Sequence, residues 1–198
     1  MKNASDSPQI NDEKTLRSQL LQLLTQFAYQ EGDFLLSSGQ RSSYYINGKQ
    51  VTLRAEGALT LGRLLFSFLP PDTQAIAGLT LGADPMVTAV SIVSAWENHP
   101  IPALIIRKAP KGHGTQAYIE GPTLAPGAKV VVLEDVVTTG RSAMIAVERL
   151  QAVGYRVEQI LALVDREQGG AQLYQSQGLT FKAIFSISEI QQQARRNK

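Results

Sequence analysis

Cysteine is absent from all 198 residues, which excludes disulfide bonds and any mechanism that needs a thiolate. A cysteine-free chain suits a reducing compartment, although it does not require one. The sequence also contains no apolar run long enough to cross a membrane, and residues 1–14 are polar rather than signal-like. We therefore expect a cytoplasmic protein that has no membrane partner.

An excess of charge of one sign is also missing. The chain has 19 Lys and Arg against 17 Asp and Glu, a net charge of +2, so it has no strongly basic footprint for nucleic acid. Its 43% hydrophobic residues argue against disorder. The length fits one domain with a sizeable core. We expect a flexible tail over residues 1–14, a single domain over 15–198 and a small-molecule substrate.

The most informative stretch runs from Val130 to Ser142. Four consecutive apolar residues predict a strand that is buried on both faces of a parallel sheet. Glu134 and Asp135 follow at the carboxyl end of that strand, where open α/β sheets bind ligands. Residues 138–142 then form a turn rich in Thr, Gly and Ser that leads into a predicted helix. Hydroxyls, unpaired N–H groups and a helix dipole suit phosphate, although an ordinary acidic turn with a helix cap has the same local pattern.

Apolar periods elsewhere alternate between helix and strand, with acids, glycines and cations at successive strand ends. This order predicts an α/β fold, a doubly wound and mostly parallel central sheet flanked by helices. The first helix should end before Gly32, and Trp96 in a later helix should serve packing. The further segments are helices over 57–69, 86–96 and 189–195 and strands over 75–79, 102–106, 159–164 and 179–186.

Residues 34–47 predict two extended pieces around a Ser/Gly turn. They could form an ordinary surface hairpin. Alternatively, residues 15–50 contribute a small N-terminal hood, in which Tyr44 or Tyr45 stacks on a planar ligand. The local spacing leaves both interpretations open.

Cations follow two of the predicted strands. Arg107, Lys108, Lys111 and His113 belong to a Gly- and Pro-containing segment, which could be a solvated loop or a set of cations that closes over a polyphosphate. His113 could also supply a proton. Arg166 suits a bidentate grip on a carboxylate, although a salt bridge with a neighbouring acid explains it equally well.

The stretch 130–142 resembles the phosphoribosyl pyrophosphate (PRPP) motif of the type I phosphoribosyltransferases. Residues 34–170 as a whole resemble the orotate phosphoribosyltransferase family, on three further motifs: Ser38-Gly39 with Ser42 and Tyr44, Arg107-Lys108-x-x-Lys111-x-His113-Gly114, and Asp165-Arg166-Glu167-x-Gly169-Gly170. The resemblance implies transfer of the 5-phosphoribosyl group from PRPP to orotate in de novo pyrimidine biosynthesis, which gives orotidine 5′-phosphate and pyrophosphate. The alternatives are a transferase for another nucleobase and a non-catalytic PRPP-sensing regulator on the same fold.

The resemblance also implies roles for individual residues. Orotate would be bound by Thr138 and Arg166, and the catalytic residues would be Lys111, His113 and Asp135. Mg²⁺ would be the cofactor, carried by the pyrophosphate without direct protein ligands. The chain would form a homodimer that shares loop 107–115 across its interface. The PRPP-binding residues would be Arg107, Lys108, Lys111, His113, Glu134, Asp135, Val136, Val137, Thr138, Thr139, Gly140, Arg141 and Ser142.

Three positions depart from the pattern of the family. Ser37 and the turn Gly82-Ala83-Asp84 stand where lysines are often found, so some contacts to pyrophosphate or orotate must differ. Arg141 is bulkier than the residue that is usual between Gly140 and Ser142. We expect its side chain to point outward and leave the loop backbone free.

Overall fold

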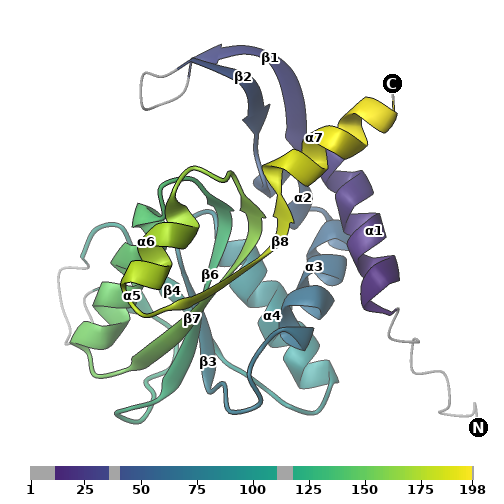
Figure 1. The fold of residues 1–198 in the computed structure, drawn as a ribbon. Coiled ribbons are helices and arrows are strands. Elements are labelled where there is room, and N and C mark those ends of the chain that lie inside the picture. The colour runs from purple at the N-terminus through teal and green to yellow at the C-terminus, as the bar shows by residue number, and fades with distance from the viewer. Residues whose placement is uncertain (1–11, 36–40, 111–117, 198) are drawn as a thin grey trace, which may run out of the picture.

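The computed structural model describes residues 12–35, 41–110 and 118–197. Its centre is a six-stranded sheet in the order β5-β4-β3-β6-β7-β8, which is parallel except for the edge strand β5 (Figure 1). This arrangement confirms the predicted mostly parallel sheet. The strands are β3 Ala75–Leu79, β4 Ala103–Ile106, β5 Ile119–Glu120, β6 Lys129–Val137, β7 Arg156–Asp165 and β8 Thr180–Ser186.

Helices cover both faces of the sheet, as a doubly wound fold requires (Figure 1). Side chains alternate along β6, so that Val131 and Leu133 join the core on one face while Val130 and Val132 join the core on the other. The first face packs against α1 Glu13–Leu23, α3 Ala55–Ser67, α4 Asp84–Trp96 and α7 Ile187–Arg196. The second packs against α5 Arg141–Ala152 and α6 Gly170–Ser176.

Successive strands are added to one edge of the sheet up to β5 and to the opposite edge from β6 onward, so the strand order reverses between β3 and β6. These strands are neighbours in the sheet, with Gly78 opposite Leu133, although β4 and β5 lie between them in the sequence. Such a switch point leaves a crevice at the carboxyl ends of the strands, where open α/β sheets bind ligands. Glu134 and Asp135 directly follow Leu133, so the fold places the acid pair at this crevice.

Two further strands, β1 Tyr29–Leu35 and β2 Arg41–Ile46, form a separate antiparallel ribbon above the sheet (Figure 1). It corresponds to the predicted hood. The preceding helix ends before Gly32, as predicted: its last turn is the π-helix η1 Leu24–Ala28, and the chain is extended from Tyr29 onward. A short helix, α2 Lys49–Thr52, follows the hood.

Two further details differ from expectation. α1 begins at Glu13, inside the stretch predicted as a tail, because the side chain of Asp12 caps it by accepting from the N–H of Thr15 at 2.9 Å. The remainder of that tail lies outside the described residues. The side chain of Trp96 is 65% exposed, so its predicted packing role within this chain is wrong. Within the described segments, no helix has the length and apolar character of a membrane span.

Candidate active site at the carboxyl end of the sheet

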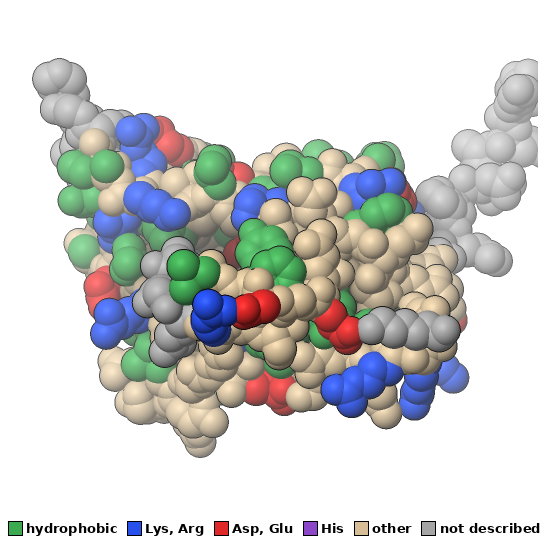
Figure 2. Space-filling view, turned by 90° about the horizontal axis from the view of Figure 1, so that it is seen from above, with side chains coloured by type: hydrophobic (Ala, Val, Ile, Leu, Met, Phe, Trp, Pro, Cys, Tyr) green, Lys and Arg blue, Asp and Glu red, His purple; other side chains and the backbone are tan. Residues whose placement is uncertain are grey.

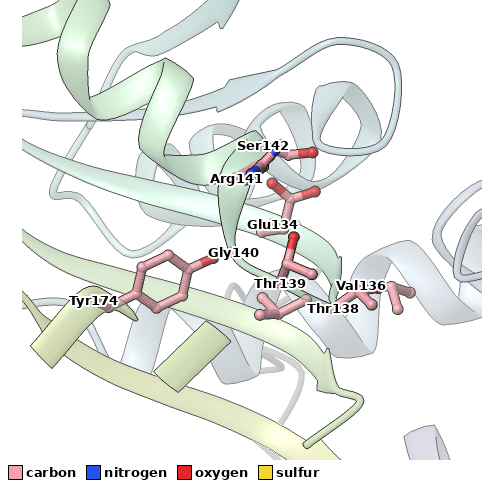
Figure 3. Close-up of a pocket in the computed structure, with 9 residues that line it drawn as sticks. Glu134, Val136, Thr138, Thr139, Gly140, Arg141, Ser142 and Tyr174 are labelled. Atoms are coloured by element: carbon pink, nitrogen blue, oxygen red, sulfur yellow. The ribbon is translucent and has the colours of Figure 1, made fainter. Parts of the chain in front are cut away.

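A small cavity of about 80 Å³ lies where β6 passes into α5 (Figure 3). Gly140 caps α5 in the left-handed conformation, with φ 84°, and a Cβ there would come within 2.9 Å of the ring of Tyr174. Only glycine combines that φ with so close an approach. The first turn of α5 directs backbone N–H groups into the cavity, which suits an anion. The lining consists of Glu134, Val136, Val137, Thr138, Thr139, Gly140, Arg141, Ser142 and Tyr174.

Glu134 is buried at the base of this cavity, with 6% of its surface exposed. Its Oε2 has no hydrogen-bond partner among the described residues. Burial, followed by the charge of Asp135, raises the pKa of the Glu134 carboxyl from 4.5 to about 8. Near neutral pH the ligand-free protein therefore holds Glu134 mostly as the neutral acid.

This shift makes the stability of the ligand-free protein depend on pH. Between pH 4.5 and about 8 an unfolded chain ionises Glu134 while the folded chain keeps the proton, so stability falls as the pH rises through this window. Glu134→Gln removes that loss. We expect its melting temperature, relative to wild type, to rise from pH 5 to pH 8.5 by several degrees, since about 1 kcal/mol corresponds to roughly 2–4 °C at this size.

Thermal unfolding of both proteins at pH 5, 7 and 8.5 without ligand measures this difference. Glu158→Gln, which removes an exposed acid from β7, corrects for the loss of one negative charge. A difference between Glu134→Gln and wild type that stays constant across the three pH values would contradict the burial argument.

Asp135 lies in different surroundings from Glu134, because successive residues of a strand face opposite sides. Its carboxylate is 3.7 Å from the Nζ of Lys49 in α2. The turn after β3 packs directly against it, since a Cβ at Gly82 would come within 2.4 Å of its Oδ1. A lysine side chain at Gly82 would displace this carboxylate, so the departure from the family pattern here has a steric consequence. Lys49 supplies a cation from the other side.

The described part of loop 107–115 is held at its base by Arg149 of α5. The guanidinium of Arg149 donates to the carbonyls of Arg107 and Lys108, the second at 3.2 Å, and lies 4.0 Å from the ring centre of Tyr118. The Arg107 side chain itself pairs with Glu120 at 2.9 Å. These contacts hold Arg107 and Lys108 against α5 and β5. Lys111 and His113, together with Ser37, Ser38 and Gly39 of the hood, lie outside the described residues.

Arg166 joins the site to the hood. Its backbone N–H donates to the carbonyl of Val137 at 2.8 Å, which holds it beside the phosphate loop. Its Nε donates to the hydroxyl of Tyr44 at 3.1 Å, and its guanidinium lies 4.9 Å from the centre of that ring. Tyr44 is therefore an inner residue of the hood, whereas Tyr45 is exposed and packs on Phe34.

Comparison with known proteins identifies the family of this chain. No family model matches the chain. It is 70% identical over 185 residues to an orotate phosphoribosyltransferase of Nostoc, which covers 93% of this chain and 90% of the relative. An orotate phosphoribosyltransferase of Aquifex aeolicus is 43% identical over 79% of this chain and 86% of its own length. The chain belongs to the orotate phosphoribosyltransferase family.

Solved structures agree with this assignment. The Mycobacterium tuberculosis orotate phosphoribosyltransferase in complex with PRPP superposes with a TM-score of 0.73 at 32% identity, over 88% of this chain and 98% of that one. An adenine phosphoribosyltransferase of Leishmania donovani, at 15% identity and a TM-score of 0.60, shares the fold alone. The fold thus extends beyond the orotate phosphoribosyltransferases, and the sequence relatives define the narrower family.

The structure gathers the described members of the predicted site at one edge of the sheet. Glu134 and residues 136–142 line the cavity, Asp135 lies on the opposite side of β6, and Arg166 adjoins Val137. Arg141 is exposed, which agrees with the expectation that its side chain points outward. Sequence reasoning missed Lys49, Arg149 and Tyr174, which come from segments with no distinctive motif.

Proposed function

We propose that this protein carries out the reaction of its family, the transfer of a 5-phosphoribosyl group from PRPP to orotate. The observation that carries the proposal is the convergence of three groups at one sheet edge: the phosphate cavity, the acid pair, and Arg166 held by Tyr44. These groups match a sugar phosphate, a ribose and a carboxylate-bearing base in turn. The products would be orotidine 5′-phosphate and pyrophosphate.

The chemistry divides among these groups. N1 of orotate replaces the pyrophosphate oxygen at C1 of the ribose, through a transition state in which positive charge develops on the sugar. The turn at residues 138–142 would hold the 5′-phosphate, and Asp135 would stabilise the ribosyl cation. Arg107 and Lys108, fixed by Arg149, would face the departing pyrophosphate, with Lys111 and His113 of the same loop.

Mg²⁺ is the cofactor that we propose for this reaction. The described residues contain no group of three or more His, Asp or Glu side chains that could hold a metal ion. At the proposed ribose site, the Asp135 carboxylate already faces Lys49. This setting fits an ion that keeps several waters and is held mainly by oxygens of the polyphosphate. Bound there, Mg²⁺ would neutralise charge on the leaving group.

An assay of orotate consumption tests the proposed reaction directly. The protein with PRPP and Mg²⁺ should consume orotate, which is followed by the loss of its ultraviolet absorbance. Parallel reactions with adenine, hypoxanthine and uracil should show no product. Turnover of one of these bases without turnover of orotate would assign a different transferase. Binding of PRPP with no turnover of any base would indicate a sensing regulator.

We also propose that the protein is a homodimer. Five large apolar residues, Leu53, Leu59, Leu81, Ile92 and Trp96, are exposed around two adjoining hollows of about 520 and 160 Å³ between α3 and α4. Exposed apolar patches of this kind mark protein interfaces. Lys49, the partner of Asp135, also lines the larger hollow. A second copy on this apolar face would therefore lie next to the proposed site, which suits an exchange of loop 107–115.

Trp96→Glu is expected to break this association. Truncating a buried interface tryptophan typically costs about 2 kcal/mol or more, roughly 30-fold in the dissociation constant, and desolvating a carboxylate adds to that cost. Trp96 is exposed within the protomer, so the substitution should leave the fold intact. Sedimentation velocity should show a monomer. Ile145→Glu, on the α5 side, is the control and should remain dimeric. An unchanged sedimentation coefficient for Trp96→Glu would exclude the apolar face.

Loop exchange has a test of its own. Mixed Lys111→Ala and Asp135→Asn subunits should recover part of the activity that each variant lacks, because a mixed dimer would retain one intact site. No recovery would exclude sharing of the loop between subunits.

A cytoplasmic location stays a proposal that rests on the cysteine-free sequence, which suits a reducing compartment.

A further inference from the structure

Tyr174 is a buried residue for which the proposed reaction has not yet assigned a role. It lies in α6, it is 0% exposed, and its ring lines the phosphate cavity. None of the described residues provides a hydrogen-bond partner for its hydroxyl. In Figure 3 this hydroxyl points toward the turn that carries Gly140 and toward Glu134. A buried hydroxyl without a partner lowers stability, so its retention requires an explanation.

The ring of Tyr174 has a structural role that is separate from its hydroxyl. It packs beneath Gly140, where a Cβ would come within 2.9 Å of Cε1, and against Phe181 at 5.1 Å between ring centres. One turn earlier in α6, a Cβ at Gly170 would come within 2.3 Å of Val137. The same face of α6 therefore supports the phosphate loop at two points. Phenylalanine would preserve these contacts.

The hydroxyl is suited to donate to an anion. Burial, with the nearby charges of Glu134 and Asp165, raises the pKa of Tyr174 well above its usual range, so the group keeps its proton. The backbone N–H groups of α5 favour an anion in the same cavity. The cavity, at about 80 Å³, has the room of roughly two or three water molecules. It therefore accommodates a phosphate group close to the turn.

We propose that the Tyr174 hydroxyl is a further binding group of this cavity, which donates a hydrogen bond to the phosphate monoester of a phosphorylated ribose, directly or through one water. The unpartnered state of the hydroxyl is then a property of the ligand-free protein. Ligand binding supplies the missing acceptor. The proposal rests on the proposed function for the identity of the sugar phosphate, and its chemistry requires only the phosphate group.

Tyr155 provides a matched control. It is a buried tyrosine of the same core, and its hydroxyl accepts from the N–H of Leu124 at 3.0 Å. Tyr155→Phe removes a hydroxyl that is already in use within the protein, whereas Tyr174→Phe removes one that is not. If the Tyr155 hydroxyl has a structural role and the Tyr174 hydroxyl binds a ligand, Tyr155→Phe should lower stability and leave binding unchanged, while Tyr174→Phe should do the reverse.

The experiment measures ribose 5-phosphate binding by titration calorimetry and thermal unfolding without ligand, for both variants and wild type. We expect Tyr174→Phe to bind ribose 5-phosphate roughly 10- to 100-fold more weakly, the effect of one hydrogen bond to a charged group. Its melting temperature should equal or exceed that of wild type. Tyr155→Phe should bind normally and melt at a lower temperature.

Unchanged binding of ribose 5-phosphate by Tyr174→Phe would overturn the proposal, and so would a loss of stability like that of Tyr155→Phe. Because the probe carries no base and no pyrophosphate, the result does not depend on turnover. A wild-type protein that binds ribose 5-phosphate but fails to consume orotate would refute the proposed reaction, and the comparison of the two tyrosines would still stand.

Discussion

Asp135→Asn is expected to lower kcat by about 10²- to 10³-fold, the usual cost of removing one electrostatic group that stabilises charge in a transition state. The amide has nearly the same shape as the carboxylate, so it still fits between Lys49 and the turn at Gly82. The negative charge beside the ribose is lost. Steady-state kinetics with saturating PRPP and orotate measure the effect.

The fold of this variant should be almost unaffected. The Lys49 side chain is 42% exposed, so its pairing with Asp135 is screened by water and contributes little stability. Thermal unfolding should therefore shift by only a degree or two. Asp72→Asn is the matched control, because Asp72 pairs with Lys129 on the surface away from the site. Wild-type turnover in Asp135→Asn would remove this acid from the proposed chemistry.

The phosphate loop could be predicted because its signals are contiguous. A buried strand, an acid pair and a hydroxyl-rich turn occupy the thirteen residues from Val130 to Ser142, so local sequence contains all of the information. The parallel sheet followed from the same kind of local pattern, repeated along the chain. The carboxyl ends of parallel strands meet at one edge, which brought Arg107, Glu134 and Arg166 together in the prediction.

The different surroundings of the two acids could not be predicted in this way. Alternation along a strand places Glu134 and Asp135 on opposite faces, but the sequence does not reveal what covers each face. Glu134 is buried beside the phosphate cavity, while Asp135 meets Lys49 and Gly82 from distant segments. The raised pKa of Glu134 follows from that burial. Local sequence treats the two residues as one motif.

Apolar patterns also leave two questions open that only the tertiary structure answers. A hydrophobic period predicts an apolar helix face but does not show whether the same chain covers that face. Trp96 was therefore expected to pack, whereas the structure leaves it exposed. The sequence also does not reveal where the hydroxyl of a tyrosine points, so Tyr174 was not recognised as part of the site. Charge also does not mark the site on the surface. On the face of the molecule that carries the hood, acidic and basic side chains are interspersed (Figure 2).

Arg166→Gln is expected to lower kcat/KM for orotate by about 10²-fold while the KM for PRPP changes little. A charge-assisted pair with a carboxylate is worth roughly 1.5–3 kcal/mol, and each 1.4 kcal/mol is about tenfold. Within the described residues, the guanidinium donates through Nε to Tyr44, so its two terminal amino groups are available for a bidentate grip on the base. Initial rates at varied orotate and varied PRPP separate the two substrates.

Two companion variants give this prediction its control. Tyr44→Phe keeps the ring beside Arg166 but removes the acceptor of the 3.1 Å hydrogen bond, so the loss for orotate should be only a few-fold, about 1 kcal/mol. Arg166→Lys should recover little, because an ammonium cannot reproduce a planar two-point contact. An equal loss for PRPP and orotate in Arg166→Gln would instead indicate damage to the phosphate loop.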